Sequence, residues 1–258
     1  MPHHYTLLEA DEPAAFQVVR EHGRSPFFLT CDHAGDLVPR RLHSLGVSPR
    51  DWQRHIASDI GAAAVASRLA ERLDAFLILQ PWSRLVIDCN RPPGSAESIV
   101  PFCDETRIPG NESVSPFEVL AREREVFWPY HHRIASELAQ RDAQQRESIL
   151  IAVHSFTPSL HGVQRPWHAG VFYNRDHRFA HALLQSLRED AALVVGDNEP
   201  YAASDSTDYT IPVHGEQRGL LHVGVEIRQD LIAADAGLVE WSERLAQALS
   251  SARVRGET

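Results

Sequence analysis

Cysteine is scarce in this chain, with only three (Cys31, Cys89 and Cys103) among 258 residues. An odd, small number in a chain of this length does not support a disulfide framework, so we expect a reducing compartment. No apolar run approaches the ~20 residues that span a bilayer. The N-terminus, MPHHYTLLEADEP, lacks the charged-then-apolar pattern of a signal peptide. These absences predict a cytoplasmic protein without membrane contact.

Positive charge is also in short supply, because 25 basic side chains face 35 acidic ones, a formal net charge of -10. This balance argues against nucleic-acid binding, which usually requires a basic surface. A small anionic substrate remains compatible, since it needs only local arginines. The chain has no internal repeat, Gly-x-Ser-x-Gly nucleophile motif, phosphate-binding loop or dinucleotide fingerprint.

The composition is that of a globular protein with ample core, at 43% apolar and 23% charged residues. The length fits one large domain. We therefore predict a single catalytic domain over residues 1–258, in which the polar residues 1–25 form a mobile N-terminal segment. A homo-oligomer is compatible with this composition.

Three predicted strands end in residues that can do chemistry. Ile149–Val153 is a short, continuously apolar run, typical of a strand buried inside an α/β sheet. Open α/β sheets place their sites at the carboxyl ends of such strands. The strands with their polar residues are Ile149–Val153 with His154, Phe27–Cys31 with His33, and Leu221–Leu231 with Glu226.

The remaining periodicity completes the predicted fold, a single three-layer αβα domain with a mixed, largely parallel central sheet. Apolar stripes at helical spacing predict helices over residues 51–73, 115–141 and 238–249. The second of these should begin at Ser115, followed by proline and then Glu118. Residues 85–87 are apolar and predict a further short strand.

His33 and His154 are candidate zinc ligands, and a carboxylate would complete a three-ligand site with one open position. Asp36 lies three residues after His33, but an aspartate in a turn can equally bond to the backbone. Asp59 precedes an apolar helical stripe, where its position favours a helix N-cap, although it could point towards a metal. Asp36 and Asp59 therefore compete as the carboxylate ligand.

Arg84, Asn90 and Arg91 flank the predicted strand at 85–87 and form a candidate anion site. Arginine presents a planar fork that grips a carboxylate with two hydrogen bonds, and asparagine adds an amide donor. Asp88 lies among them, where it could instead hold Arg84 in a structural ion pair. We expect both roles here, with Asp88 structural and the Asn90–Arg91 pair binding substrate.

Two later residues complete the predicted site. Glu226 can serve as a general base, although a rim ion pair is the alternative for a glutamate at a strand end. His214 follows a polar loop at 202–212 that could close over a substrate. We assign His214 to substrate binding.

Six segments carry the polar residues just described together with their immediate neighbours. They are CDHAGDLVP (31–39), the helix start DIGA (59–62), SRLVIDCNRP (83–92), AVHSFTP (152–158), GDNEPY (196–201) and VEIRQDL (225–231).

In these segments the chain resembles the N-formylglutamate amidohydrolase family, from about Phe27 to Leu231. The resemblance implies a phosphorylase/hydrolase-like fold related to that of zinc carboxypeptidases. It also implies one Zn²⁺ held by His33 and His154, Glu226 as the base, and Asn90–Arg91 binding the substrate carboxylate.

The expected activity is hydrolysis of the amide of a small N-acyl amino acid such as N-formylglutamate, by water that Glu226 activates on zinc. The partner would be a small anionic, amino-acid-like substrate. Two alternatives are a non-catalytic module that binds small anions on the same fold, and a hydrolase of peptide or cell-wall amides.

Overall fold

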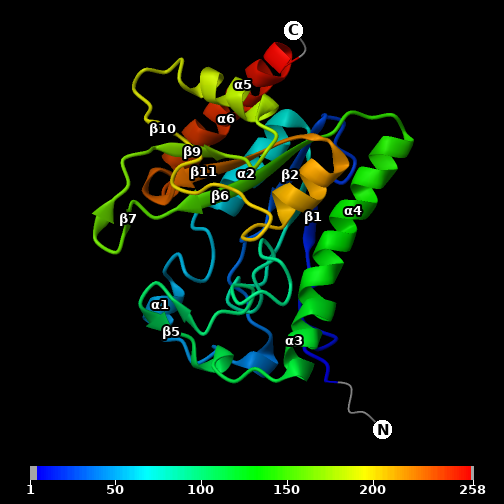
Figure 1. The fold of residues 1–258 in the computed structure, drawn as a ribbon, viewed down its shortest axis with the longest axis vertical. Coiled ribbons are helices and arrows are strands. Elements are labelled where there is room, and N and C mark those ends of the chain that lie inside the picture. The colour runs from blue at the N-terminus through cyan, green and yellow to red at the C-terminus, as the bar shows by residue number, and fades with distance from the viewer. Residues whose placement is uncertain (1–4, 257–258) are drawn as a thin grey trace.

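A seven-stranded sheet forms the centre of the computed structural model, which describes residues 5–256 (Figure 1). Four adjacent strands, β3, β2, β6 and β11, run parallel, whereas the edge strand β1 and the later strand β9 run antiparallel to their neighbours. The predicted mixed, largely parallel sheet is confirmed. Across the sheet the order is β1 (Gln17–Val19), β3 (Phe76–Leu79), β2 (Phe27–Cys31), β6 (Ile149–Phe156), β11 (Leu221–Arg228), β9 (Ala169–Phe172) and β10 (Val195–Asp197).

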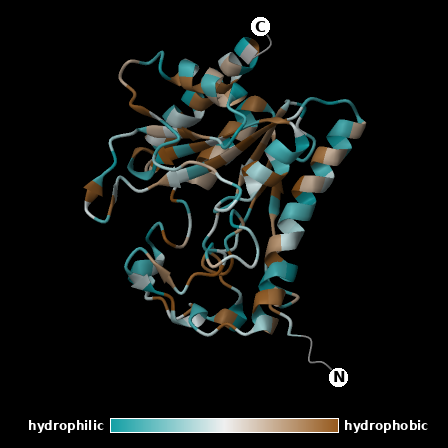
Figure 2. Cartoon of the chain, in the orientation of Figure 1, coloured by the Kyte–Doolittle hydropathy of each residue, from teal (hydrophilic) through white to brown (hydrophobic). Residues whose placement is uncertain are grey.

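Helices cover both faces of the sheet, as predicted for three layers. Because strand side chains alternate between faces, Leu29 and Ile151 join the core under α2, α5 and α6, while Phe28 and Leu150 join the core under α4. Strands are mostly brown in Figure 2, and the covering helices mix brown with teal. The helices are α1 (Pro49–Trp52), α2 (Ala62–Leu73), α3 (Pro116–Arg122), α4 (Trp128–Ala143), α5 (Arg178–Leu187) and α6 (Asp235–Gly256).

Two small hairpins lie outside the main sheet. One pairs β4 (Phe102–Cys103) with β5 (Thr106–Arg107), and the other pairs β7 (Ser159–Leu160) with β8 (Val163–Gln164). Within residues 5–256, no helix combines the length and the apolar character needed to cross a membrane.

The N-terminal segment is more ordered than its polar composition suggests. β1 pairs with β3 at the edge of the sheet, and Leu7 is fully buried. Residues 5–25 thus contain a strand of the sheet and a core side chain where we expected a mobile segment, and residues 1–4 lie outside the described part of the chain.

Residues 85–87 are buried but do not form a strand. Two of their carbonyl groups accept from side chains, since Asn111 donates to Leu85 and the fully buried Arg122 donates to Val86. A buried backbone needs hydrogen bonds but not necessarily a sheet. The apolar run therefore indicated burial correctly and the strand incorrectly.

Two predicted helices are interrupted. The pattern at 51–73 divides into α1 and α2, and Gly61, with φ of 81°, is the N-cap of α2. The helix predicted from 115 does begin with a Ser115–Glu118 capping box. A π-helical turn at 123–127 then separates α3 from α4. This turn lies directly before Trp128–Pro129, where the proline cannot donate a backbone hydrogen bond.

Candidate metal centre and substrate pocket

The carboxyl ends of three neighbouring parallel strands bring the predicted residues together. His33 follows β2 by two residues, and His154 of β6 lies in register with Glu226 of β11. β6 and β11 each continue for two residues beyond these positions. His154 and Glu226 therefore project from the strands themselves, where pairing holds the backbone in place.

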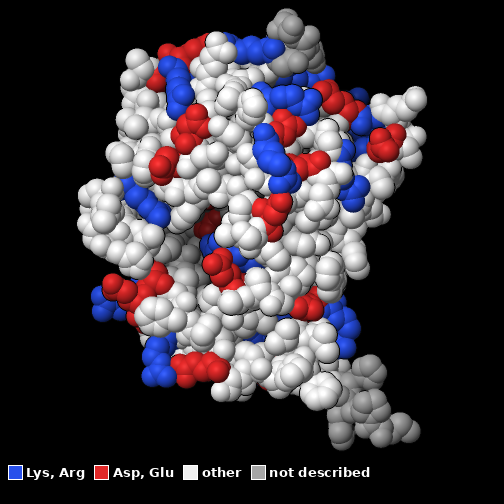
Figure 3. All heavy atoms as spheres, in the orientation of Figure 1, with Lys and Arg blue, Asp and Glu red and all other residues white. Residues whose placement is uncertain are grey.

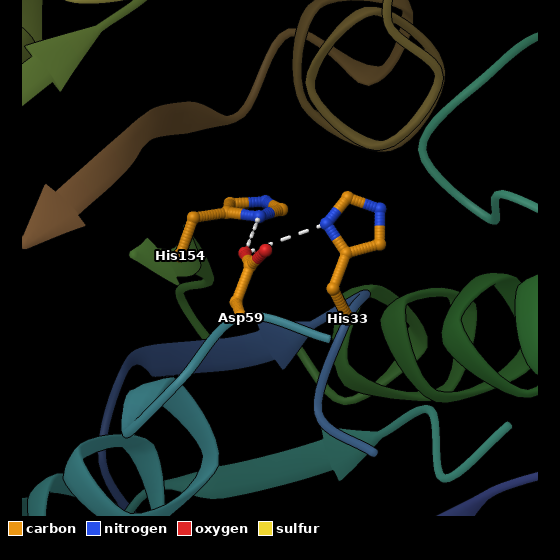
Figure 4. Close-up of side chains that lie close together, drawn as sticks. All are labelled: His33, Asp59 and His154. Atoms are coloured by element: carbon orange, nitrogen blue, oxygen red, sulfur yellow. Dashed lines mark hydrogen bonds and ion pairs between the residues drawn. The ribbon is translucent and has the colours of Figure 1, made fainter. Parts of the chain in front are cut away.

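His33, Asp59 and His154 form a compact buried group in which both imidazole rings turn towards one carboxylate oxygen (Figure 4). Asp59 Oδ2 lies 2.9 Å from His154 Nδ1 and 3.4 Å from His33 Nδ1. Within residues 5–256 this is the group of such side chains that could hold a metal ion, with its ligand atoms within 4.8 Å of one another.

The outward nitrogen of each ring faces a second carboxylate. His33 Nε2 lies 2.7 Å from Asp88 Oδ1, and His154 Nε2 lies 3.4 Å from Asp32 Oδ2. Tyr130 donates to the other oxygen of Asp32 at 2.7 Å. Metal-binding histidines commonly have such outer carboxylates, which set the tautomer and orient the ring. The inward nitrogens and Asp59 are thus a donor set that fits a zinc ion.

Asp59, and not Asp36, stands beside the histidines. Asp36 is exposed and its carbonyl accepts from the Trp52 indole. The backbone N–H of Asp59 donates to the His33 carbonyl at 3.0 Å, which ties the two loops together. The N-cap position that the pattern favoured for Asp59 belongs to Gly61. The Asp59 carboxylate is therefore not used to cap α2.

Glu226 is 6% exposed, and its Oε2 is buried without a hydrogen-bond partner among the described residues. Burial raises the pKa of this carboxyl to about 7, against the opposing effect of His154. A carboxyl with such a pKa can both accept and release a proton near neutral pH.

A pocket of about 400 Å³ opens over these residues. Figure 3 shows a hollow on this face with acidic and basic atoms recessed inside it. Charged and polar side chains form part of its lining, and aromatic and apolar ones form another part. The first set includes His55, Arg84, Asn90, Arg91, Glu97 and Asp208, and the second set is Phe156, Phe172, Pro200, Tyr201 and Ala202.

The three predicted anion-binding residues all line this pocket, but they differ in how many hydrogen bonds their side chains already make within the protein. Arg84 donates to Asp88 at 2.8 Å, which confirms their expected ion pair. The Asn90 side chain holds the 204–210 segment, because it donates to Asp208 and accepts from the backbone of residues 209 and 210. Arg91 Nη1 donates to the Thr207 carbonyl at 2.6 Å. Asn90 is thus occupied by the protein, whereas Arg91 uses only part of its guanidinium.

His214 lies away from the pocket lining, contrary to its assignment to substrate binding. It is 2% exposed within a π-helical turn at 210–215, and its Nε2 lies 3.0 Å from His131 Nδ1. The other nitrogen of His131 lies 2.8 Å from the Cys89 carbonyl. The two rings therefore form a buried pair that links α4 to the 210–215 turn.

This pair should make the protein less stable in mild acid. Burial lowers the pKa of His131 to about 4, whereas the unfolded chain titrates near 6.5. Below about pH 6.5 the unfolded state binds a proton that the folded state excludes, so the free energy of unfolding should fall. For His131 the loss from pH 7 to pH 5 is about 2 kcal/mol.

Urea unfolding at both pH values, compared between wild type and His131→Asn, measures this contribution. The variant should lose about 2 kcal/mol less than wild type. If the free energy of unfolding falls equally in both proteins between pH 7 and pH 5, His131 does not cause the loss of stability.

Sequence reasoning also missed Asp32 and Tyr201. Asp32 precedes His33 directly, but nothing in the pattern shows that it turns back towards His154. Tyr201 lies in GDNEPY, a segment that contributed to the resemblance without a role of its own.

The fold and the site define a class, an α/β protein with a candidate metal centre at the carboxyl edge of its sheet. The chain belongs to the N-formylglutamate amidohydrolase family, whose model matches residues 25–233. This membership indicates amidohydrolase activity.

Two solved structures resemble the whole chain. A gene product from Agrobacterium tumefaciens is 34% identical with a TM-score of 0.95, covering 98% of this chain and 100% of its own. N-formylglutamate amidohydrolase from Ralstonia eutropha is 16% identical with a TM-score of 0.66, covering 94% of this chain and 98% of its own. The second likeness supports the fold alone. No curated protein matches the chain significantly.

Proposed function

We propose that the protein is a zinc-dependent amidohydrolase that cleaves the carbon–nitrogen bond of a small N-acyl amino acid, of which N-formylglutamate is the type. The observation that carries this proposal is the direction of the two imidazole rings. Both turn Nδ1 towards Asp59 and present Nε2 to an outer carboxylate. Buried Glu226 stands on the strand next to His154. Family membership supports the amide chemistry.

His33, Asp59 and His154 would hold the zinc ion. Bound there, zinc would lower the pKa of water towards ~7 and polarise the scissile carbonyl. The outer carboxylates of Asp88 and Asp32 keep the two rings oriented, so the donor atoms need little rearrangement.

Glu226 moves the proton in the proposed reaction. Its unpaired Oε2 takes a proton from the attacking water as the water oxygen bonds to the acyl carbon. The carbon–nitrogen bond then breaks, and the carboxyl returns the proton to the leaving nitrogen. The products are a carboxylic acid and a free amino acid.

Arg91 would bind the substrate carboxylate. Nη1 is occupied by Thr207, and Nε lies 3.2 Å from Glu97 Oε2, on a side chain that is 60% exposed. Among residues 5–256, none accepts a hydrogen bond from Nη2, which leaves donors for a ligand. Arg84 adds positive charge to the same side of the pocket, and Asn90 positions the segment beside it.

The direct test is hydrolysis of N-formyl-L-glutamate by protein stripped with a chelator and then reloaded with zinc. The reloaded protein should release formate and glutamate, and the stripped protein should not. Amidating the α-carboxylate should lower kcat/KM about tenfold or more, because a charge-assisted hydrogen bond is lost.

Failure would separate the alternatives. Binding of N-formylglutamate without turnover by zinc-loaded protein would favour a small-anion-binding module. Turnover confined to peptide or cell-wall amides would replace the proposed substrate class.

A further inference from the structure

We propose that the pocket accepts acyl groups larger than formyl, and that an apolar wall of Phe156, Phe172, Pro200 and Tyr201 binds them. This inference rests on the proposed function and names its substrate class more closely, as N-acyl amino acids with an aliphatic or aromatic acyl group.

The order of the strands places this wall on one side of the candidate metal centre. The centre and Glu226 lie over β2, β6 and β11, in the middle of the sheet. Arg84 and Arg91 come from the segment that follows β3 on one side. Phe172 belongs to β9 and Tyr201 follows β10, both on the other side. Phe156 lies on β6 itself, two residues beyond His154, so the apolar lining extends from the centre towards β9 and β10, whereas Arg84 and Arg91 come from the opposite side.

Two glycines let this wall approach the sheet closely. A Cβ at Gly224 would lie 2.0 Å from the Phe172 ring, and a Cβ at Gly170 would lie 2.0 Å from the Glu199 carbonyl oxygen. Any side chain at these positions would push away the Phe172 ring or the Glu199–Pro200 backbone. The centres of the Phe172 and His154 rings are 5.8 Å apart, so the apolar wall reaches the candidate metal centre.

The outer part of the wall is held by a buried arginine. Arg165 is 9% exposed, and its guanidinium lies 4.9 Å from the centre of the Tyr201 ring and 5.9 Å from that of Phe156. Cation–π contacts of this kind stabilise an aromatic side chain in one orientation. Tyr201 lines the pocket and is itself 45% exposed. Arg165 therefore holds the ring in place and leaves it accessible to a ligand.

The two ends of the substrate differ in chemistry, so each would contact a different part of the pocket lining. An N-acyl amino acid carries its carboxylate on the nitrogen side of the scissile amide and its acyl group on the carbonyl side. If Arg91 binds the carboxylate, the acyl group extends towards Phe156, Phe172 and Tyr201. A formyl group has no carbon beyond the carbonyl and would leave this wall unused. At 400 Å³ the pocket falls within the ~300–1,000 Å³ range of sites for drug-sized ligands.

The test compares N-formyl-, N-acetyl-, N-butanoyl- and N-benzoyl-L-glutamate on the zinc-loaded full chain. From formyl to butanoyl, kcat/KM should rise by up to about fourfold for each methylene that becomes buried. In Tyr201→Ala the ratio of kcat/KM for butanoyl over formyl should fall about tenfold. Phe117→Ala is the matched control, because Phe117 lies on α3, is 66% exposed and is outside the pocket lining. It should leave the ratio unchanged.

Fastest turnover of the formyl compound, or an equal loss for all four in Tyr201→Ala, would overturn the inference. If none is hydrolysed, the proposed function fails, and calorimetric binding to Glu226→Gln protein decides the inference separately. Tighter binding of the butanoyl and benzoyl compounds, lost in the double variant with Tyr201→Ala, would uphold the apolar wall. Equal or absent binding would reject it.

Discussion

Glu226→Gln is expected to lower kcat by about 10²–10⁴-fold, the usual contribution of a positioned general acid–base. Glutamine matches glutamate in size but cannot take the proton of the attacking water. The variant should still bind about one zinc per chain, because Glu226 is outside the group formed by His33, Asp59 and His154. Turnover of an N-acyl amino acid and elemental analysis of the same preparation measure both quantities.

A matched control comes from a glutamate with the same burial. Glu137 on α4 is also 6% exposed, pairs with Arg133 at 2.9 Å and is not among the residues that line the pocket. Glu137→Gln should keep near-normal kcat even if the lost ion pair reduces stability. Near-normal turnover in Glu226→Gln would remove Glu226 from the proton transfer, and loss of zinc would indicate that it acts through the metal centre instead.

The folded stability of Glu226→Gln provides a further check. Burying a carboxyl that lacks a partner costs free energy, and a neutral amide in its place costs less than a carboxylate. The variant should therefore unfold at the same urea concentration as wild type or a higher one. A loss of activity in a protein of full stability cannot be attributed to misfolding.

The strands that carry the site were predictable because apolar residues dominate each of them, most clearly in β6. Runs such as Ile149–Val153 are buried on both faces, and parallel neighbours place their carboxyl ends at one edge. That rule brought His33, His154 and Glu226 together without any knowledge of loops. β1 was missed because an edge strand of three residues has no such run.

The carboxylate in the candidate metal group was not predictable from spacing. Asp36 is near His33 in sequence, but the chain after β2 turns it towards solvent. A backbone hydrogen bond holds Asp59 beside His33, and the N-cap of α2 is Gly61, two residues after the position that the pattern favoured. Contacts between loops depend on the whole fold, so a choice between two aspartates needs the structure. The same reason explains His214, whose partner His131 is 83 residues away.

His154→Ala should reduce the zinc content from about one per chain to near zero and abolish turnover. Removing an outer partner of a metal-binding histidine typically costs about 10–100-fold in metal affinity. Removing the histidine itself should cost more, since only His33 and Asp59 then remain. Asp32→Asn, which changes only the outer partner of His154, should fall between His154→Ala and wild type.

This ranking of zinc affinities is a more specific test than the loss of zinc in one variant. Nonspecific damage to the protein would not make Asp32→Asn intermediate between wild type and His154→Ala. His132→Ala serves as the control, since His132 is an exposed histidine on α4. It should retain wild-type zinc affinity in a competition titration with a chromophoric chelator. Retention of zinc by His154→Ala would place the metal elsewhere. Absence of zinc from every variant and from wild type, even after metal is added, would leave the α/β fold intact and favour the anion-binding module.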